Sequence, residues 1–156
     1  MRTFYEKLVI VGNALRSIFL LVVRVGWGLG FFYAGSGKLM HIDQFATFLT
    51  TLGFPAPVAT AYFVASVEAV GGLMLLIGLG SRLVGLILTI NMSVAYFTAH
   101  MEAIVGFWNN PRVFVEESAF LYLFVAVIVF VFGPGLFSID ELLQRYVFKN
   151  RREQLP

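Results

Sequence analysis

Four long apolar stretches constrain this chain more than any other feature of its sequence. A helix needs about 20 residues to cross a hydrocarbon core of about 30 Å, and each stretch comes close to or exceeds that length. Helices of this composition find the apolar surroundings they require in a lipid bilayer. We therefore predict an all-α protein, a four-transmembrane-helix bundle with spans at about 17–37, 58–80, 83–99 and 113–133.

The composition excludes most other classes of protein. Of the 156 residues, 59% are hydrophobic, only 13% are charged and none is cysteine. Because a soluble domain usually has about 25% charged residues, a water-soluble globule and a nucleic-acid-binding module are both excluded. Without cysteine, the chain can form no disulfide, thiolate metal site or cysteine-ligated iron–sulfur cluster of its own. We expect no covalently bound cofactor.

Lysine and arginine are divided unequally between the two sides of the predicted membrane. One side receives Arg2, Lys7, Arg16, Arg82, Arg145, Lys149, Arg151 and Arg152, and the other receives Lys38 and Arg112. The side richer in basic residues normally faces the cytoplasm. We therefore expect a multi-pass protein of the inner or plasma membrane with both termini in the cytoplasm.

Two further helices are expected outside the spans. Between the first and second spans, Phe45, Phe48 and Leu49 share one face of a short helix, which we place at the outer membrane surface. After the fourth span, Ser138 and Glu141 have the spacing of a capping box. They open an amphipathic helix over 139–152, which we expect to lie on the cytoplasmic surface, its terminal Arg151 and Arg152 meeting anionic headgroups.

One polar side chain in each span is predicted to lie near the middle of the membrane. Counting inward at about 1.5 Å per residue brings Arg24, Glu68, Asn91 and Tyr122 to a common depth. One interpretation is a buried Arg24–Glu68 ion pair that only fixes the helix register, with Asn91 and Tyr122 completing its hydrogen bonds. The other is a polar pocket that binds a head group or relays protons. The sequence leaves both open.

A second polar cluster is expected at the outer face. It contains Lys38, His41, His100, Glu102, Glu116 and Glu117. These residues come from different loops and show no ligand spacing such as HExxH. We interpret the cluster as a hydrated rim of the bundle and predict no metal site.

Four short motifs along the chain, taken together in their order and spacing, point to a known protein family. They are RVGWGLGFFYAGSGKL (24–39), LGFPAP (52–57), VEAVGGLMLLIGLGSRL (67–83) and GPGLFSID (133–140). Together they resemble the DoxX family of small four-helix membrane proteins. The resemblance matches Lys38 to a basic residue at the end of the first span, Glu68 to an acidic residue in the second, and Arg82 to an arginine after that span.

The resemblance implies a role in membrane redox chemistry. The family name is associated with membrane subunits of a thiosulfate:quinone oxidoreductase, and other members are linked to redox-stress complexes. We hypothesise an accessory or anchoring subunit of a quinone-linked membrane redox system, with redox cofactors held by partner subunits. In this hypothesis Arg24 or Tyr122 hydrogen-bonds a quinone carbonyl and Glu68 exchanges protons.

Two other functions remain as alternatives. The chain could serve as a structural scaffold or assembly factor in a membrane complex. It could also be a small proton-coupled transporter that uses Glu68. Because four helices leave little room for alternating access, the transporter hypothesis implies a homo-oligomer.

Overall fold

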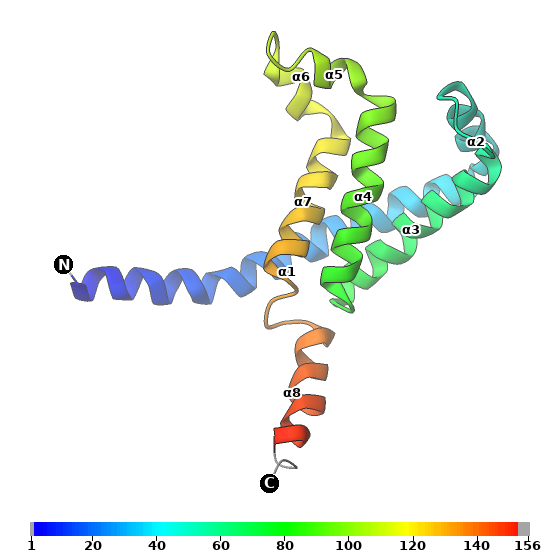
Figure 1. Ribbon diagram of the computed structural model, residues 1–156. Helices are drawn as coiled ribbons and strands as arrows, with labels where there is room; N and C mark the ends of the chain where they lie inside the picture. Colours follow the sequence, from blue (N-terminus) through cyan, green and yellow to red (C-terminus); the bar gives the residue numbers. More distant parts are fainter. Residues whose placement is uncertain (1, 153–156) are drawn as a thin grey trace.

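The computed structural model describes the backbone of residues 2–152 and the side chains of residues 4–12 and 15–146. Throughout this part of the chain the regular structure is helical, which confirms the all-α prediction. Figure 1 shows the helices α1 (Arg2–Met40), α2 (Ile42–Thr51), α3 (Pro57–Ile77), α4 (Ser81–Ala99), α5 (Met101–Val105), α6 (Pro111–Glu116), α7 (Ser118–Phe132) and α8 (Ile139–Arg152).

Three of the described helices are long and apolar enough to cross a membrane. They are α3, α4 and the Phe4–Met40 part of α1, while α7 is a shorter apolar helix. The first predicted span, 17–37, lies inside the 39-residue α1. The fourth predicted span, 113–133, is divided, because Glu117 has an extended backbone (φ −63°, ψ 127°) that separates α6 from α7.

Glycine brings the backbones of α1 and α3 into close contact. A Cβ atom at Gly28 would lie 2.9 Å from the backbone nitrogen of Leu76, and one at Gly35 would collide with the backbone of Ala69. Small residues at membrane-helix interfaces allow this approach. Gly28 and Gly35 therefore lie on the face of α1 that packs against α3.

A second pair of helices, α4 and α7, packs in the same way. A Cβ atom at Gly85 would lie 2.9 Å from the backbone nitrogen of Phe130. The main hydrophobic core lies between the two pairs and includes Phe31, Leu75, Leu88 and Val129. The pairs meet near the α8 end of the molecule and diverge toward α2, α5 and α6 (Figure 1).

The predicted short helix after the first span is present as α2. Its buried residues Ala46 and Leu49 pack with Ala61 of α3 in a small hydrophobic cluster of their own. Glycine at position 53 makes the following turn possible, because the backbone there has a positive φ of 76°. Of the predicted apolar face, Leu49 and Phe45 pack on the bundle, whereas Phe48 remains 47% exposed.

One of the two hydrogen bonds of the predicted capping box is formed at the start of α8, where the Glu141 backbone nitrogen donates to Ser138 Oγ at 3.1 Å, while the Glu141 carboxylate accepts from Arg145. The intervening Asp140 fastens α8 to the α3–α4 turn. Its carboxylate accepts hydrogen bonds from the backbone nitrogens of Gly80 at 2.7 Å and Ser81 at 2.8 Å. The side chains of Arg151 and Arg152, expected near headgroups, lie outside the described residues.

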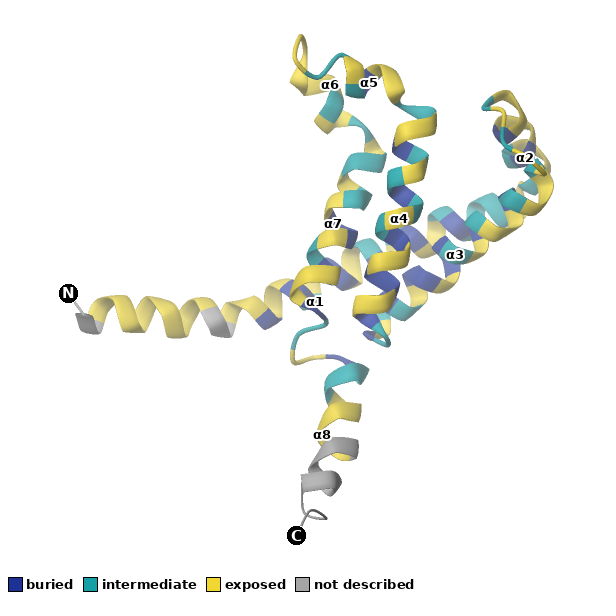
Figure 2. Ribbon diagram, viewed as in Figure 1, coloured by how far each residue is buried: buried dark blue, intermediate teal, exposed yellow. Residues whose placement is uncertain are grey.

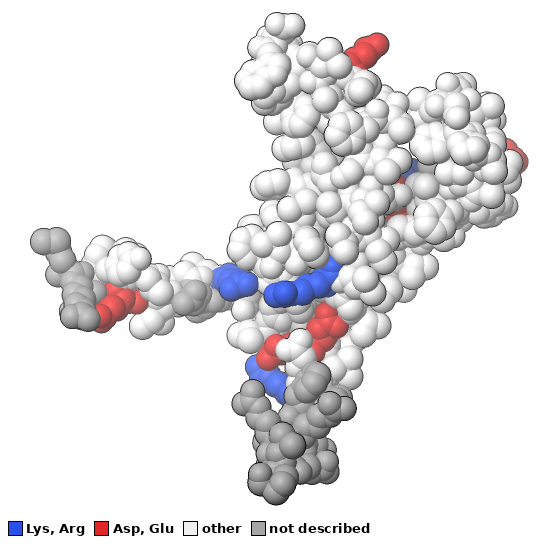
Figure 3. Space-filling view, in the orientation of Figure 1, with Lys and Arg blue, Asp and Glu red and all other residues white. Residues whose placement is uncertain are grey.

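Basic side chains gather where the bundle meets α8, as Figure 3 shows in blue. Arg16 Nη2 donates to the Phe132 carbonyl at 3.0 Å, at the end of α7. The guanidinium of Arg82 lies over Gly133, just beyond that helix end. These contacts place positive charge at a helix C-terminus, where it is favourable.

The first half of α1 extends beyond the other helices. Figure 2 shows its residues 4–12 coloured as exposed, and Phe4, Leu8 and Val11 are among the apolar side chains there. Packing against α3 begins only in the second half of the helix.

Candidate ligand-binding cavity

Lys38 of α1 and Glu68 of α3 form a salt bridge inside the bundle. Lys38 Nζ lies 2.6 Å from each of the two carboxylate oxygens of Glu68. The side chain of Glu68 is 2% exposed and that of Lys38 is 32% exposed. The ammonium group also lies 5.0 Å from the centre of the Phe45 ring of α2, within the range of a cation–π contact.

Asn91 and Tyr122 extend this polar site to the second helix pair. Asn91 Nδ2 on α4 lies 3.4 Å from Glu68 Oε1, a long hydrogen bond. Tyr122 on α7 packs edge-to-face on Phe31, with ring centres 4.7 Å apart. Its hydroxyl lies over Gly30, which has no side chain to obstruct it. The site thus draws one residue from each of α1, α3, α4 and α7.

A cavity of about 340 Å³ adjoins the salt bridge. Lys38, Glu68, Asn91 and Tyr122 all line it. Most of the remaining wall is apolar and aromatic, with Phe31, Phe45, Phe48 and Phe54 among its residues. Figure 3 shows blue and red atoms in the hollow between the two diverging arms of the molecule. A small apolar cavity with a few convergent polar groups is the usual form of a small-molecule site.

The predicted Arg24–Glu68 ion pair is not formed, and Arg24 lies outside the cavity. Its side chain, 1% exposed, donates through Nη2 to the Phe137 carbonyl at the α8 end of the bundle. Arg24 adjoins Gly78, which follows Glu68 by ten residues along α3. That separation corresponds to about 15 Å along the helix, so the two charges occupy different depths.

The residues predicted to share an outer rim separate into different environments. Lys38 and His100 line the cavity, which the rim interpretation did not anticipate. His100 Nδ1 also lies 3.0 Å from Glu117 Oε2. Those two residues and Glu102 line a second cavity of about 350 Å³.

The other two members of the rim lie elsewhere on the surface. His41 Nδ1 lies 3.1 Å from the Gly37 carbonyl in the last turn of α1, and the His41 side chain is exposed. Glu116 accepts a hydrogen bond from Arg112 Nε at 2.6 Å. Over the described residues, no group of three or more His, Asp or Glu side chains could hold a metal ion.

The role of Lys38 could have been found from a spacing in the sequence. Gly28 and Gly35 are seven residues apart and therefore share one face of a helix. Lys38 follows Gly35 by three residues, so it belongs to the same face if the helix continues beyond residue 37. Because α1 ends at Met40, Lys38 remains helical and faces α3.

Comparison with known proteins identifies the family. The DoxX family model matches residues 19–101, more than half of the chain. The chain belongs to the DoxX family. This DoxX region contains Lys38, Glu68 and Asn91, whereas Tyr122 lies beyond it.

A curated relative extends the similarity over most of the DoxX protein. The chain is 26% identical over 140 residues to a protein of Bacillus subtilis (strain 168) named "Putative oxidoreductase CatD". The alignment covers 90% of this chain and 95% of the relative. No solved structure matches the chain.

Proposed function

We propose that this DoxX protein is an accessory or anchoring subunit of a quinone-linked membrane redox system and binds a quinone head group in the cavity. The observation that carries the proposal is the Lys38–Glu68 salt bridge at the wall of an aromatic cavity inside the bundle. Ionisable residues within membrane helices usually mark a functional site. The word "oxidoreductase" in the name of the Bacillus subtilis relative agrees with this proposal.

The cavity residues can hydrogen-bond the two carbonyl oxygens of a quinone and pack against its ring. Lys38, Asn91 and Tyr122 carry hydrogen-bond donors for carbonyl oxygens, and the aromatic walls suit the flat ring. Reduction of a quinone to its hydroquinone consumes two electrons and two protons. Glu68 would deliver and recover protons, while a redox cofactor of a partner subunit would exchange the electrons.

In this proposal four helices cross the inner or plasma membrane. The 15 residues of α7 correspond to about 22 Å, which is less than a hydrocarbon core of about 30 Å. The preceding α6 would complete the fourth crossing. Arg16, Arg24 and Arg82 all contact the α8 end of the bundle, so this end would face the cytoplasm.

The direct test is to measure the quinone that the protein retains. The protein would be extracted gently from its own membrane, and bound quinone would be quantified by native mass spectrometry. We expect about one quinone per chain in the wild type and at least a tenfold lower occupancy in Glu68→Gln. Glu116→Gln is the matched control, because Glu116 pairs with Arg112 on the surface.

Wild-type protein without any quinone, after extraction from quinone-containing membranes, would overturn the proposal. Equal occupancy in Glu68→Gln and Glu116→Gln would remove the assigned site. A redox-cofactor-bearing partner in fixed ratio would support the subunit role.

One observation favours a scaffold or assembly factor as a second candidate function. The exposed apolar side chains of the first half of α1, such as Phe4, Tyr5 and Leu8, are available to pack against another membrane protein. Site-specific photo-crosslinking from Leu8 in intact cells tests this candidate. A crosslink to one protein in fixed ratio supports it, and crosslinks to lipid alone count against it.

A further inference from the structure

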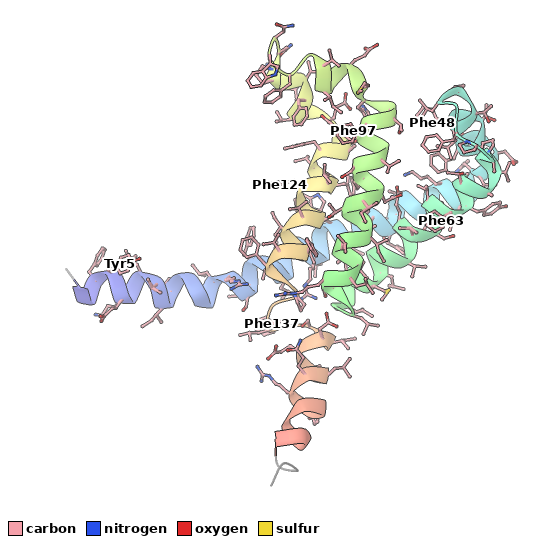
Figure 4. The ribbon with its side chains drawn as sticks, viewed as in Figure 1. Tyr5, Phe48, Phe63, Phe97, Phe124 and Phe137 are labelled. Carbon is pink, nitrogen blue, oxygen red and sulfur yellow. The ribbon has the colours of Figure 1, made fainter. Side chains whose placement is uncertain are left out.

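The mouth of the cavity lies between α2 and α4. Phe48 of α2 and Val94 of α4 both line the cavity, yet their side chains are 47% and 45% exposed on the surface of the molecule. Thr98, one turn beyond Val94, also lines the cavity and is exposed. Residues that belong to a cavity wall and to the outer surface mark its opening. Figure 4 shows Phe48 near the flank of α2 that is turned toward α4.

On the α4 side, the surface around this mouth is apolar apart from Thr98. On α4, Ile90 and Phe97 are exposed on either side of Val94 along the chain. This part of α4 belongs to a helix long and apolar enough to cross a membrane. In a bilayer such a surface meets acyl chains, so the mouth gives access to lipid.

The cavity is polar at its inner end and apolar at its mouth. Glu68 is almost fully buried and accepts its hydrogen bonds at the inner end. Along α4, the cavity-lining residues Asn91, Ala95 and Thr98 share one helix face. The seven helical steps from Asn91 to Thr98 span about 10 Å, which gives the length of this wall. A ligand that satisfies both ends has a polar head and an apolar extension.

The cavity is too small to enclose a long ligand. Its volume of about 340 Å³ lies near the lower end of the range of about 300–1,000 Å³ for small-molecule sites. One ring system fills most of such a space. A longer apolar part therefore has to leave through the mouth.

We infer that the ligand carries a long apolar tail that leaves the cavity between Phe48 and Val94 and continues into the bilayer. This inference rests on the proposed function and assigns the substrate class of the same site. The substrate is an isoprenoid quinone confined to the membrane, and short water-soluble quinones are poor ligands.

Menadione and menaquinone-4 form a matched pair of probes, because they share a methyl-naphthoquinone ring and differ in the isoprenoid tail. The chain has no cysteine, so menadione cannot form a thiol adduct with it. Binding of each would be titrated by native mass spectrometry from detergent micelles. The test variant is Val94→Trp, which fills the mouth. The control is Leu83→Trp, which adds the same side chain to an exposed position of α4 away from the mouth.

For the wild type and Leu83→Trp we expect menaquinone-4 to bind at least about tenfold more tightly than menadione, because part of the tail is buried at the mouth. Val94→Trp should lose that advantage while its affinity for menadione stays within twofold.

Two outcomes overturn the inference while leaving the proposed function intact. The first is equal binding of the two quinones by the wild type. The second is an equal loss of affinity for both quinones in Val94→Trp. Failure of the wild type to bind either quinone would overturn the proposed function, and the inference with it.

Discussion

Lys38 Nζ contacts both carboxylate oxygens of Glu68 at 2.6 Å, but the two partners differ widely in exposure. Loss of Lys38 leaves an almost fully buried carboxylate without its cation. Loss of Glu68 leaves an ammonium group that already reaches the surface. Removal of one partner of a buried pair typically costs about 3–5 kcal/mol, because the other charge is left uncompensated.

We therefore expect Lys38→Met to lower the free energy of unfolding by about 3–5 kcal/mol and Glu68→Gln to lower it by clearly less. The double variant Lys38→Met/Glu68→Met should recover most of the loss, because no buried charge remains. Thermal unfolding in detergent micelles, followed by circular dichroism, measures all three. Equal losses in the two single variants would contradict the asymmetry.

The close contact between α1 and α3 predicts opposite effects for two glycine substitutions on one helix. Gly35→Ala should destabilise the protein by about 1–3 kcal/mol, because its Cβ would collide with the backbone of Ala69. Gly26→Ala should be neutral or stabilising by up to about 1 kcal/mol, since a Cβ there has no neighbour within 4 Å. Melting temperatures of the pair check this prediction, and similar shifts in both would contradict it.

Asp140 links α8 to the first turn of α4, so its removal should loosen α8 selectively. Asp140→Ala should cost about 0.5–2 kcal/mol, as for other lost helix caps. Limited trypsin digestion at Arg145 should become faster, and Asp140→Asn should give an intermediate rate, because asparagine keeps one acceptor oxygen in place of the two that accept from Gly80 and Ser81. Unchanged digestion of Asp140→Ala would show that α8 is held by other contacts.

The hydroxyl of Tyr122 is predicted to serve the ligand and not the fold. No hydrogen bond of this hydroxyl is found among the described residues, and its ring packs on Phe31. Tyr122→Phe should therefore keep the melting temperature of the wild type. It should weaken quinone binding by about two- to tenfold, the effect of one hydrogen bond of about 0.5–1.5 kcal/mol. A stability loss with unchanged binding would reverse this assignment.

The proposed orientation predicts the behaviour of alkaline phosphatase fusions, which are active only outside the cytoplasm. A fusion at the C-terminus should be inactive, and one after Asn109, between α5 and α6, should be active. The expected difference follows from the basic residues at the α8 end. Activity at the C-terminus would overturn the orientation.

Local sequence patterns predicted the local features of the fold well. The hydrogen bond from the Glu141 backbone to Ser138 is formed as the capping-box spacing predicts, because it depends only on spacing at the start of one helix. Asn91 lies with Glu68 for a similar reason, as both occupy the middle of apolar helices joined by a short turn.

The depth of the charged side chains within the bundle was predicted less well. The position of Arg24 was counted from Ser17, but α1 begins at Arg2 and only its second half packs on α3. The depth of Arg24 in the bundle follows from its position against α3, because Arg24 adjoins Gly78 near the end of that helix. Sequence alone does not show where a continuous helix enters the bundle. The pairing of Glu68 with Lys38 was missed because the predicted span ended at residue 37, whereas α1 continues to Met40.

The small hydrophobic cluster beneath α2 has a consequence for local unfolding. Ala46, Leu49 and Ala61 belong to a cluster separate from the core that contains Phe31 and Leu88. Local opening of a protein costs only the contacts that the opening breaks. Backbone amides of α2 should therefore exchange with deuterium well before those in the middle of α3, and the protein can move one wall of its cavity while the rest stays folded.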